Sequence, residues 1–164
     1  MIRLLTGSTH TGKTLLAQRL LERHGAPYLS IDHLKMGLIR SGMCPLTPES
    51  TDEALTAVLW PVVREIVKTA VENGQSLTVE GCYIPFNWRE DFDASCLPHI
   101  RFLCLVFSEA YIRTRFDTIQ THANAIERRK DDSFCTMELL LAETRRNLEA
   151  CRRRGLPYYL IDGP

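Results

Sequence analysis

Eight consecutive residues near the start of the chain have the types and spacing needed to bind phosphate. They follow the pattern G-x-x-x-x-G-K-[ST] of the phosphate-binding loop and read Gly7-Ser8-Thr9-His10-Thr11-Gly12-Lys13-Thr14. The two glycines permit backbone angles that let successive N–H groups converge on one anion. Lys13 brings a positive charge to the β and γ phosphates, and the hydroxyl of Thr14 suits Mg²⁺. This segment therefore predicts binding of a nucleoside triphosphate together with magnesium.

The residues on either side of the loop fit the setting that the motif requires. Ile2 to Thr6 form a short apolar run, as expected of a buried parallel strand. After the loop, leucines recur at the spacing of an amphipathic helix that would end at His24 and Gly25. A helix that starts at the loop adds its free N–H groups and its dipole to anion binding.

Further apolar runs alternate with helical patterns along the rest of the chain. The expected strands are 27–31, 76–79, 100–107 and 157–161. The expected helices are 33–40, 109–120 and 137–154, with a long helix from Ser50, as its cap, to about residue 72. Pro61 should kink or break that long helix. The alternation predicts an α/β fold, with a parallel sheet covered by helices.

Two carboxylates follow the second and third expected strands. Ligands bind beyond the carboxyl ends of strands in parallel sheets, so Asp32 and Glu80 should lie at the same rim as the loop. Asp32 is a candidate to orient or deprotonate an acceptor hydroxyl, the alternative being a helix N-cap. Glu80 is a candidate to orient hydrated Mg²⁺ with Thr14, or to contact the acceptor, the alternative being an ion pair with a helix.

Side chains near these carboxylates are candidates to bind an acceptor. Lys35 and Arg40 could clamp an anionic group, unless they only cover a solvated helix face. The segment 82–98 is long for a connection and rich in aromatic residues, which favours a functional loop. Within it, Tyr83 and Trp88 are the candidates to wall an acceptor pocket.

A polar segment at about 121–134 is interpreted as a short lid. Its Arg128 and Arg129 are candidates to close over the γ phosphate during transfer, the alternative being a charge run on a solvated turn. Arg115, on the preceding helix, is a candidate contact to the nucleotide. Asp162 follows the last expected strand at the same rim and is also a candidate contact to the nucleotide.

The composition indicates how many domains the chain has and which classes of partner are not expected. The 164 residues are 45% hydrophobic and 24% charged with zero formal net charge, which indicates one globular domain over 1–164 and gives no sign of nucleic-acid or membrane binding. The chain has neither a long apolar run nor a signal-peptide layout, so we expect a cytoplasmic protein. The six cysteines form no C-x-x-C pair, which makes zinc or redox use an unfavoured interpretation. A monomer and a homodimer are both compatible with these features.

Over nearly its whole length the chain resembles the small P-loop kinases, the group around adenylate kinase, shikimate kinase, the zeta-toxin kinases and chloramphenicol phosphotransferase. The likeness is carried by Gly7 to Thr14, Asp32, the Glu80-Gly81 pair, the arginine-containing helix before a basic lid, and Asp162. The resemblance implies a three-layer fold with a five-stranded parallel sheet in the order 2-3-1-4-5. It also implies an acceptor-binding segment at about 33–60, a mobile lid, and ATP and Mg²⁺ as cofactors.

Departures from that family narrow the expected substrate. Adenylate kinases usually have an arginine where this chain has Lys35, and D-G-F-P-R where it has E-G-C-Y-I from Glu80. The expected reaction is therefore transfer of the γ-phosphoryl group of Mg-ATP to a hydroxyl of a small metabolite, sugar or antibiotic. Three alternatives stay open: a nucleoside monophosphate kinase, a nucleotide-binding switch without a small acceptor, and a toxin-like kinase acting on a nucleotide sugar. The residues leave open the acceptor itself and the choice between ATP and GTP.

Overall fold

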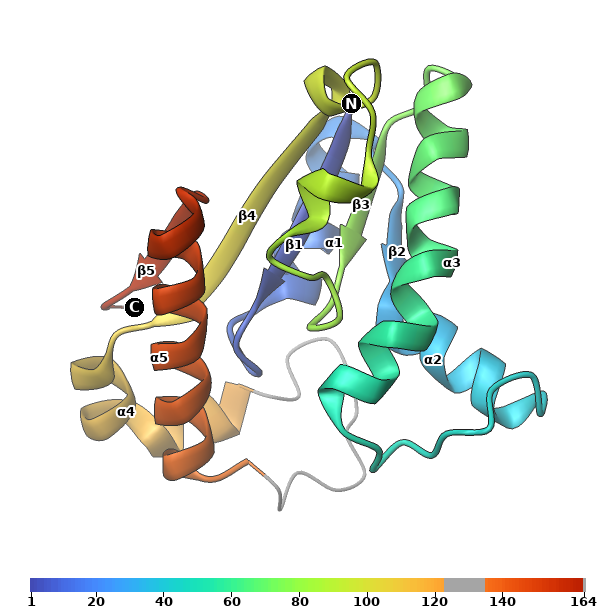
Figure 1. Ribbon diagram of the computed structural model, residues 1–164. Helices are drawn as coiled ribbons and strands as arrows, with labels where there is room; N and C mark the ends of the chain where they lie inside the picture. The colour runs from blue at the N-terminus through green and yellow to red at the C-terminus, as the bar shows by residue number, and fades with distance from the viewer. Residues whose placement is uncertain (123–134, 164) are drawn as a thin grey trace.

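A five-stranded parallel sheet forms the centre of the molecule, in the order β2-β3-β1-β4-β5 (Figure 1). The computed structural model describes residues 1–122 and 135–163. The strands are β1 Ile2–Gly7, β2 Tyr28–Ser30, β3 Leu77–Glu80, β4 Ile100–Phe107 and β5 Tyr158–Ile161. The predicted strand order is confirmed.

Helices cover both faces of the sheet. They are α1 Lys13–His24, α2 Ile31–Arg40, α3 Asp52–Glu72, α4 Glu109–His122 and α5 Met137–Arg154, with short 3₁₀ helices η1 Trp88–Asp91 and η2 Leu97–His99. Figure 1 shows α3 and α5 on one face and α1 on the other. This is the three-layer arrangement that the alternation of strands and helices predicts.

The strand register places the candidate site residues side by side. Ser30, Glu80 and Leu5 are paired in one row across β2, β3 and β1. Gly7 and Asp32 each lie two residues beyond this row, at the carboxyl edge. Because neighbouring strands are about 4.8 Å apart, the start of the phosphate loop and Asp32 are separated by two strand spacings, about 10 Å, with Glu80 between them.

The predicted bounds need correction around Asp32 and at the start of α3. Strand β2 ends at Ser30, so Asp32 lies in the first turn of α2, whose N-cap is Ser30. The cap of α3 is Thr51 and not Ser50: its hydroxyl accepts the Ala54 N–H at 3.3 Å. Both hydroxyl residues can cap a helix, and the structure uses the one that stands immediately before the helical turn.

Helix α3 continues through Pro61 without a break. Pro61 is exposed and lies inside one 21-residue helix. Figure 1 shows that the helix axis changes direction part-way along, as expected where a proline removes one hydrogen bond and its ring crowds the preceding turn. The expected kink is therefore present and the expected break is not.

The segment after β3 belongs largely to the hydrophobic core. Trp88 is 2% exposed and stacks on Phe102 with ring centroids 6.0 Å apart. Phe102 pairs with Leu4, three residues before the loop begins at Gly7, so the tryptophan lies about 10 Å from the carboxyl edge. Trp88, predicted to wall an acceptor pocket, packs its ring into the core over β4.

Among the residues that the structure describes, no helix is both long and apolar enough to cross a bilayer.

Candidate active site

The phosphate loop begins where β1 meets the backbone of β4. Gly7 has a φ of 139°, and a Cβ at this position would lie 1.9 Å from the carbonyl oxygen of Leu105. The next N–H, that of Ser8, donates to the same oxygen at 3.1 Å. Only a residue without a side chain permits this approach, which turns the chain from the strand into the loop.

Lys13 folds back into the loop that precedes it. Its Nζ donates to the carbonyl oxygen of Ser8 at 2.8 Å and to that of Gly7 at 3.3 Å, and the residue is buried. The Thr11 hydroxyl also donates to the Ser8 carbonyl, at 2.7 Å. The ammonium charge therefore sits inside the curve of the loop, where it can face an anion that the loop holds.

His10 gives the loop a second unusual backbone position. Its φ is 63°, in the left-handed region that non-glycine residues seldom adopt, at a cost of about 1–2 kcal/mol. The Thr9 hydroxyl lies 3.0 Å from its Nδ1. Such strain is typical of functional loops held in shape by their surroundings.

Thr14 and Glu80 supply oxygen atoms on the sheet side of the loop. The Thr14 hydroxyl donates to Glu80 Oε1 at 3.3 Å, and Glu80 is 2% exposed. Mg²⁺ prefers oxygen ligands and keeps several waters, so a hydroxyl and a nearby carboxylate are suited to hold it beside phosphate. These two residues therefore fit the metal that the loop implies.

Asp32, Lys35 and Tyr83 form one polar network on the other side of Glu80. Lys35 Nζ lies 2.8 Å from Asp32 Oδ1 and donates to the Tyr83 phenolic oxygen at 2.9 Å. Burial lowers the pKa of Lys35, but the charge and hydrogen bond of Asp32 outweigh it, so the pKa is raised overall. Burial has the opposite effect on Tyr83 and raises the pKa of its phenol, because it disfavours the charged phenolate. The Asp32 side chain remains 50% exposed and can meet a molecule from solvent.

The turn after β3 brings a thiol to the rim. Gly81 has a φ of 153°, and a Cβ there would lie 2.9 Å from the Cβ of Ile31. The next residue, Cys82, is exposed, and its thiol donates to the Gly7 carbonyl oxygen at 3.7 Å. This contact links the loop after β3 to the start of the phosphate loop.

Two residues of α5 reach the phosphate loop, and the pattern of the sequence did not reveal them. The Thr9 N–H donates to Glu143 Oε2 at 2.7 Å, and Asn147 Nδ2 donates to the Ser8 hydroxyl at 3.1 Å. The two residues are four apart and so share one face of the helix. That spacing was the available signal, but it equally fits a solvated helix face.

The remaining predicted residues lie away from this centre or outside the described chain. Arg40 is exposed at the end of α2, eight residues and about 12 Å along the helix from Asp32. Arg115 is exposed at a kink of α4, with φ −131° and ψ 23°. Asp162 is at the carboxyl edge, where it accepts a hydrogen bond from the Ser108 hydroxyl. Arg128 and Arg129 lie outside the described residues.

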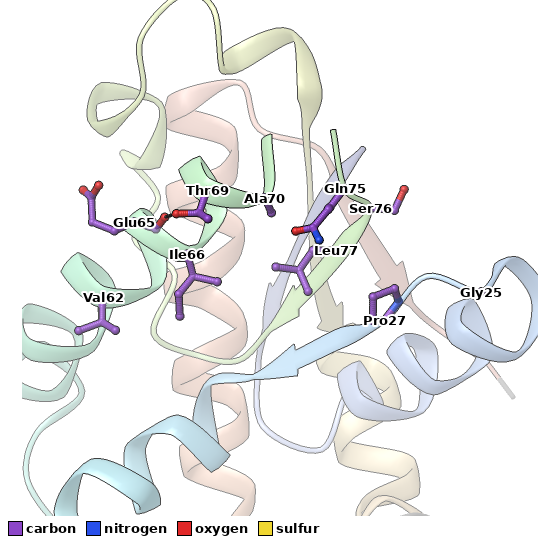
Figure 2. A pocket seen from close by; sticks show the side chains of 10 residues that line it. All are labelled: Gly25, Pro27, Val62, Glu65, Ile66, Thr69, Ala70, Gln75, Ser76 and Leu77. Carbon is purple, nitrogen blue, oxygen red and sulfur yellow. Dashed lines mark hydrogen bonds between the residues drawn. The ribbon is translucent and has the colours of Figure 1, made fainter. Parts of the chain in front are cut away.

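A hollow of about 680 Å³ lies at the opposite end of the sheet. Figure 2 shows its lining from α3, from the segment before β2, and from the start of β3 with the residues before it: Gly25, Pro27, Val62, Glu65, Ile66, Thr69, Ala70, Gln75, Ser76 and Leu77. The charged member, Glu65, is paired with Arg64 and Lys68. Size alone would favour this hollow as a binding site. The phosphate loop and both carboxylates, however, lie at the carboxyl edge, so we place the candidate active site there.

Comparison with solved structures finds the same architecture in several kinases. The chain is similar to a sugar kinase from Janibacter sp. HTCC2649, with a TM-score of 0.54, 18% identity, and coverage of 99% of this chain and 86% of that one. A gluconokinase from Sinorhizobium meliloti 1021 matches with a TM-score of 0.54, 18% identity and coverage of 99% and 83%. A shikimate kinase from Bacteroides thetaiotaomicron matches with a TM-score of 0.53, 13% identity and coverage of 99% and 86%.

The chain has the fold of the small P-loop kinases. No protein-family model matches it. The comparison with curated proteins also found no match. The likeness is therefore one of fold: a five-stranded parallel sheet with helices on both faces.

Proposed function

We propose that the chain is an ATP-dependent kinase that transfers the γ-phosphoryl group of Mg-ATP to a hydroxyl of a small metabolite. One observation carries the proposal: the phosphate loop and the half-exposed Asp32 flank the buried Glu80 at one edge of the sheet. A triphosphate held by the loop and an acceptor held at Asp32 would then face each other across the end of β3. This is the arrangement that in-line transfer requires.

The residues of the candidate active site would have different parts in that reaction. Mg-ATP, when bound, supplies the phosphoryl group and neutralises part of its charge. The loop amides and Lys13 would hold the phosphates, while Thr14 and Glu80 would hold the metal and its waters. Asp32 would orient the acceptor hydroxyl and accept its proton. Arg128 and Arg129 remain candidates to stabilise the transferring group from the lid.

The contacts of Lys35 favour a hydroxyl acceptor over a nucleoside monophosphate. A monophosphate site needs a cation free to meet the phosphate, and Lys35 is instead paired with Asp32 and Tyr83. Carboxylate and phenol groups can hydrogen-bond the hydroxyls of a polyol. The kinases of matching fold include a sugar kinase and a gluconokinase, which supports polyhydroxy compounds as the first acceptors to examine.

The test is an acceptor screen with two readouts. Thermal shift with a non-hydrolysable ATP analogue identifies compounds that stabilise the ternary complex. ADP formation is then measured with each compound, with Lys13→Ala as the inactive control. A rise of at least tenfold in ADP formation with one hydroxyl compound is the expected result. Slow phosphate release that no acceptor stimulates would instead identify a nucleotide switch.

A further inference from the structure

An acidic side chain occupies one of the hydrogen-bond donors of the phosphate loop. Glu143 Oε2 accepts the Thr9 N–H at 2.7 Å, the length of a charge-assisted hydrogen bond. Asn147, one turn further along α5, donates to the Ser8 hydroxyl and is 6% exposed. The helix therefore approaches the loop with one carboxylate and one neutral amide.

The surroundings of Glu143 contain both signs of charge. Within residues 1–122 and 135–163, the charged and titratable groups near it are Lys13 of α1, Asp52 of α3, Cys82 after β3, Arg146 of α5, and His10, which contacts Thr9. Burial raises the pKa of the Glu143 carboxyl, against the lowering effects of the Thr9 N–H and of Lys13. Arg146 lies 3.8 Å from Asp52, so its charge is shared between two carboxylates.

We propose that Glu143 is an internal anion that competes with the triphosphate for the phosphate loop. The inference rests on the proposed function, since it assumes that the loop binds a nucleotide. A carboxylate at the Thr9 N–H and close to Lys13 meets the same donors and the same charge that attract phosphate. Nucleotide binding then requires Glu143 to leave the N–H or to take up a proton, because two anions would otherwise share one site.

This competition gives α5 a role in setting nucleotide affinity. Without nucleotide, Glu143 satisfies the Thr9 N–H and balances the buried Lys13. With nucleotide, the displaced carboxylate lowers affinity by a like-charge interaction. Asn147 carries no charge, so its bond to Ser8 can persist in both states. Glu143 thus acts on nucleotide affinity through its interaction with the phosphates and takes no part in the transfer itself.

The experiment compares nucleotide affinity among variants by calorimetry, without acceptor. Glu143→Gln keeps an oxygen for the Thr9 N–H and removes the charge, and Glu143→Ala removes both. We expect each variant to bind ATP about fivefold to tenfold more tightly than wild type. Inorganic tripolyphosphate should show the same gain, and adenosine none. Glu149→Gln removes an exposed charge from the same helix and should leave affinity unchanged.

A purely structural role predicts a different pattern. If Glu143 only holds the loop in shape, Glu143→Ala weakens ATP binding and Glu143→Gln restores it, which would overturn the proposal. The ratio of wild-type to Glu143→Gln dissociation constants should also fall toward one as pH drops through the carboxyl pKa. A ratio that does not change with pH contradicts the competition.

The outcome separates this inference from the proposed kinase activity. Unchanged affinity in Glu143→Gln, with ATP bound by wild type, removes the competition and leaves the kinase proposal standing. Binding by Glu143→Gln but not by wild type supports the competition strongly. If neither protein binds ATP or tripolyphosphate, both proposals fail together.

Discussion

The ammonium group of Lys35 lies 2.8 Å from Oδ1 of Asp32. The pair is asymmetric, because the lysine side chain is 13% exposed and the aspartate side chain 50% exposed. Lys35 is therefore held from the protein side by Asp32 and Tyr83, while Asp32 keeps a face toward solvent. This arrangement fixes one oxygen of the carboxylate, and in the proposed reaction the other would meet the acceptor hydroxyl.

Asp32→Asn should separate chemistry from nucleotide binding. The variant keeps the shape of the side chain but loses the proton acceptor, so kcat should fall by about 10²–10⁴-fold. The affinity for ATP, measured by calorimetry, should stay within a few fold of wild type. Asp117→Asn, an exposed change on α4, serves as the control. Full turnover by Asp32→Asn would show that another group accepts the proton.

Lys35→Met should lower the free energy of unfolding by about 1–2 kcal/mol, between the values typical of exposed and of buried ion pairs. The pKa of Lys35 is raised in the folded protein, so its contribution is complete below the unfolded value of 10.5 and is lost as pH rises through the higher folded value. Urea unfolding of wild type and variant should therefore show a constant difference from pH 7 to 10 that shrinks above pH 10.5. A difference that already disappears by pH 8 would contradict this pairing.

Glu80→Gln should change the need for magnesium. Glu80 is 2% exposed and accepts from the Thr14 hydroxyl, so its charge acts on any cation beside that hydroxyl. The Mg²⁺ concentration for half-maximal transfer should rise about tenfold or more, as for other groups that orient metal ligands. Metal-free ADP binding should change little. Glu72→Gln, at an exposed residue, is the control, and equal Mg²⁺ curves for wild type and Glu80→Gln would exclude this role.

Gly7→Ala and Gly12→Ala should differ sharply in stability. Both glycines have a positive φ, but a Cβ at Gly7 meets the Leu105 carbonyl at 1.9 Å while a Cβ at Gly12 meets nothing within 4 Å. Gly12→Ala should lower the free energy of unfolding by about 1–2 kcal/mol, the cost of left-handed backbone. Gly7→Ala should lower it by more than about 3 kcal/mol, because the backbone must move. Equal losses in denaturant melts would mean that the β1–β4 contact can relax.

Local patterns predicted the strands and the phosphate loop, because both depend on short-range chemistry. The strand from Ile100 is a nearly continuous apolar run, and the loop needs glycine and lysine at fixed spacing. The strand order followed from the family resemblance. The end of β2 was predicted one residue too late and the start of α2 two residues too late, because the helix follows the three-residue strand directly at Ile31.

Contacts between distant segments were harder to predict. Trp88 lies in a segment with no periodicity, so nothing in its neighbours indicated that it stacks on Phe102. Glu143 and Asn147 lie on a polar helix 134 and 139 residues from their partners in the loop. These contacts form because the tertiary fold places α5 next to the loop that follows β1.

Of the six cysteines, all of which lie in the described part of the chain, Cys82 alone is exposed. Its thiol adjoins Gly7 at the mouth of the loop, and burial raises the pKa of that thiol, so alkylating reagents should modify it slowly at neutral pH and faster as the pH rises. A fluorophore attached to Cys82 would lie between the phosphate loop and Asp32, and would report ligand binding there without an engineered cysteine. Protection of this position against modification would then reveal occupancy of the site before any acceptor is known.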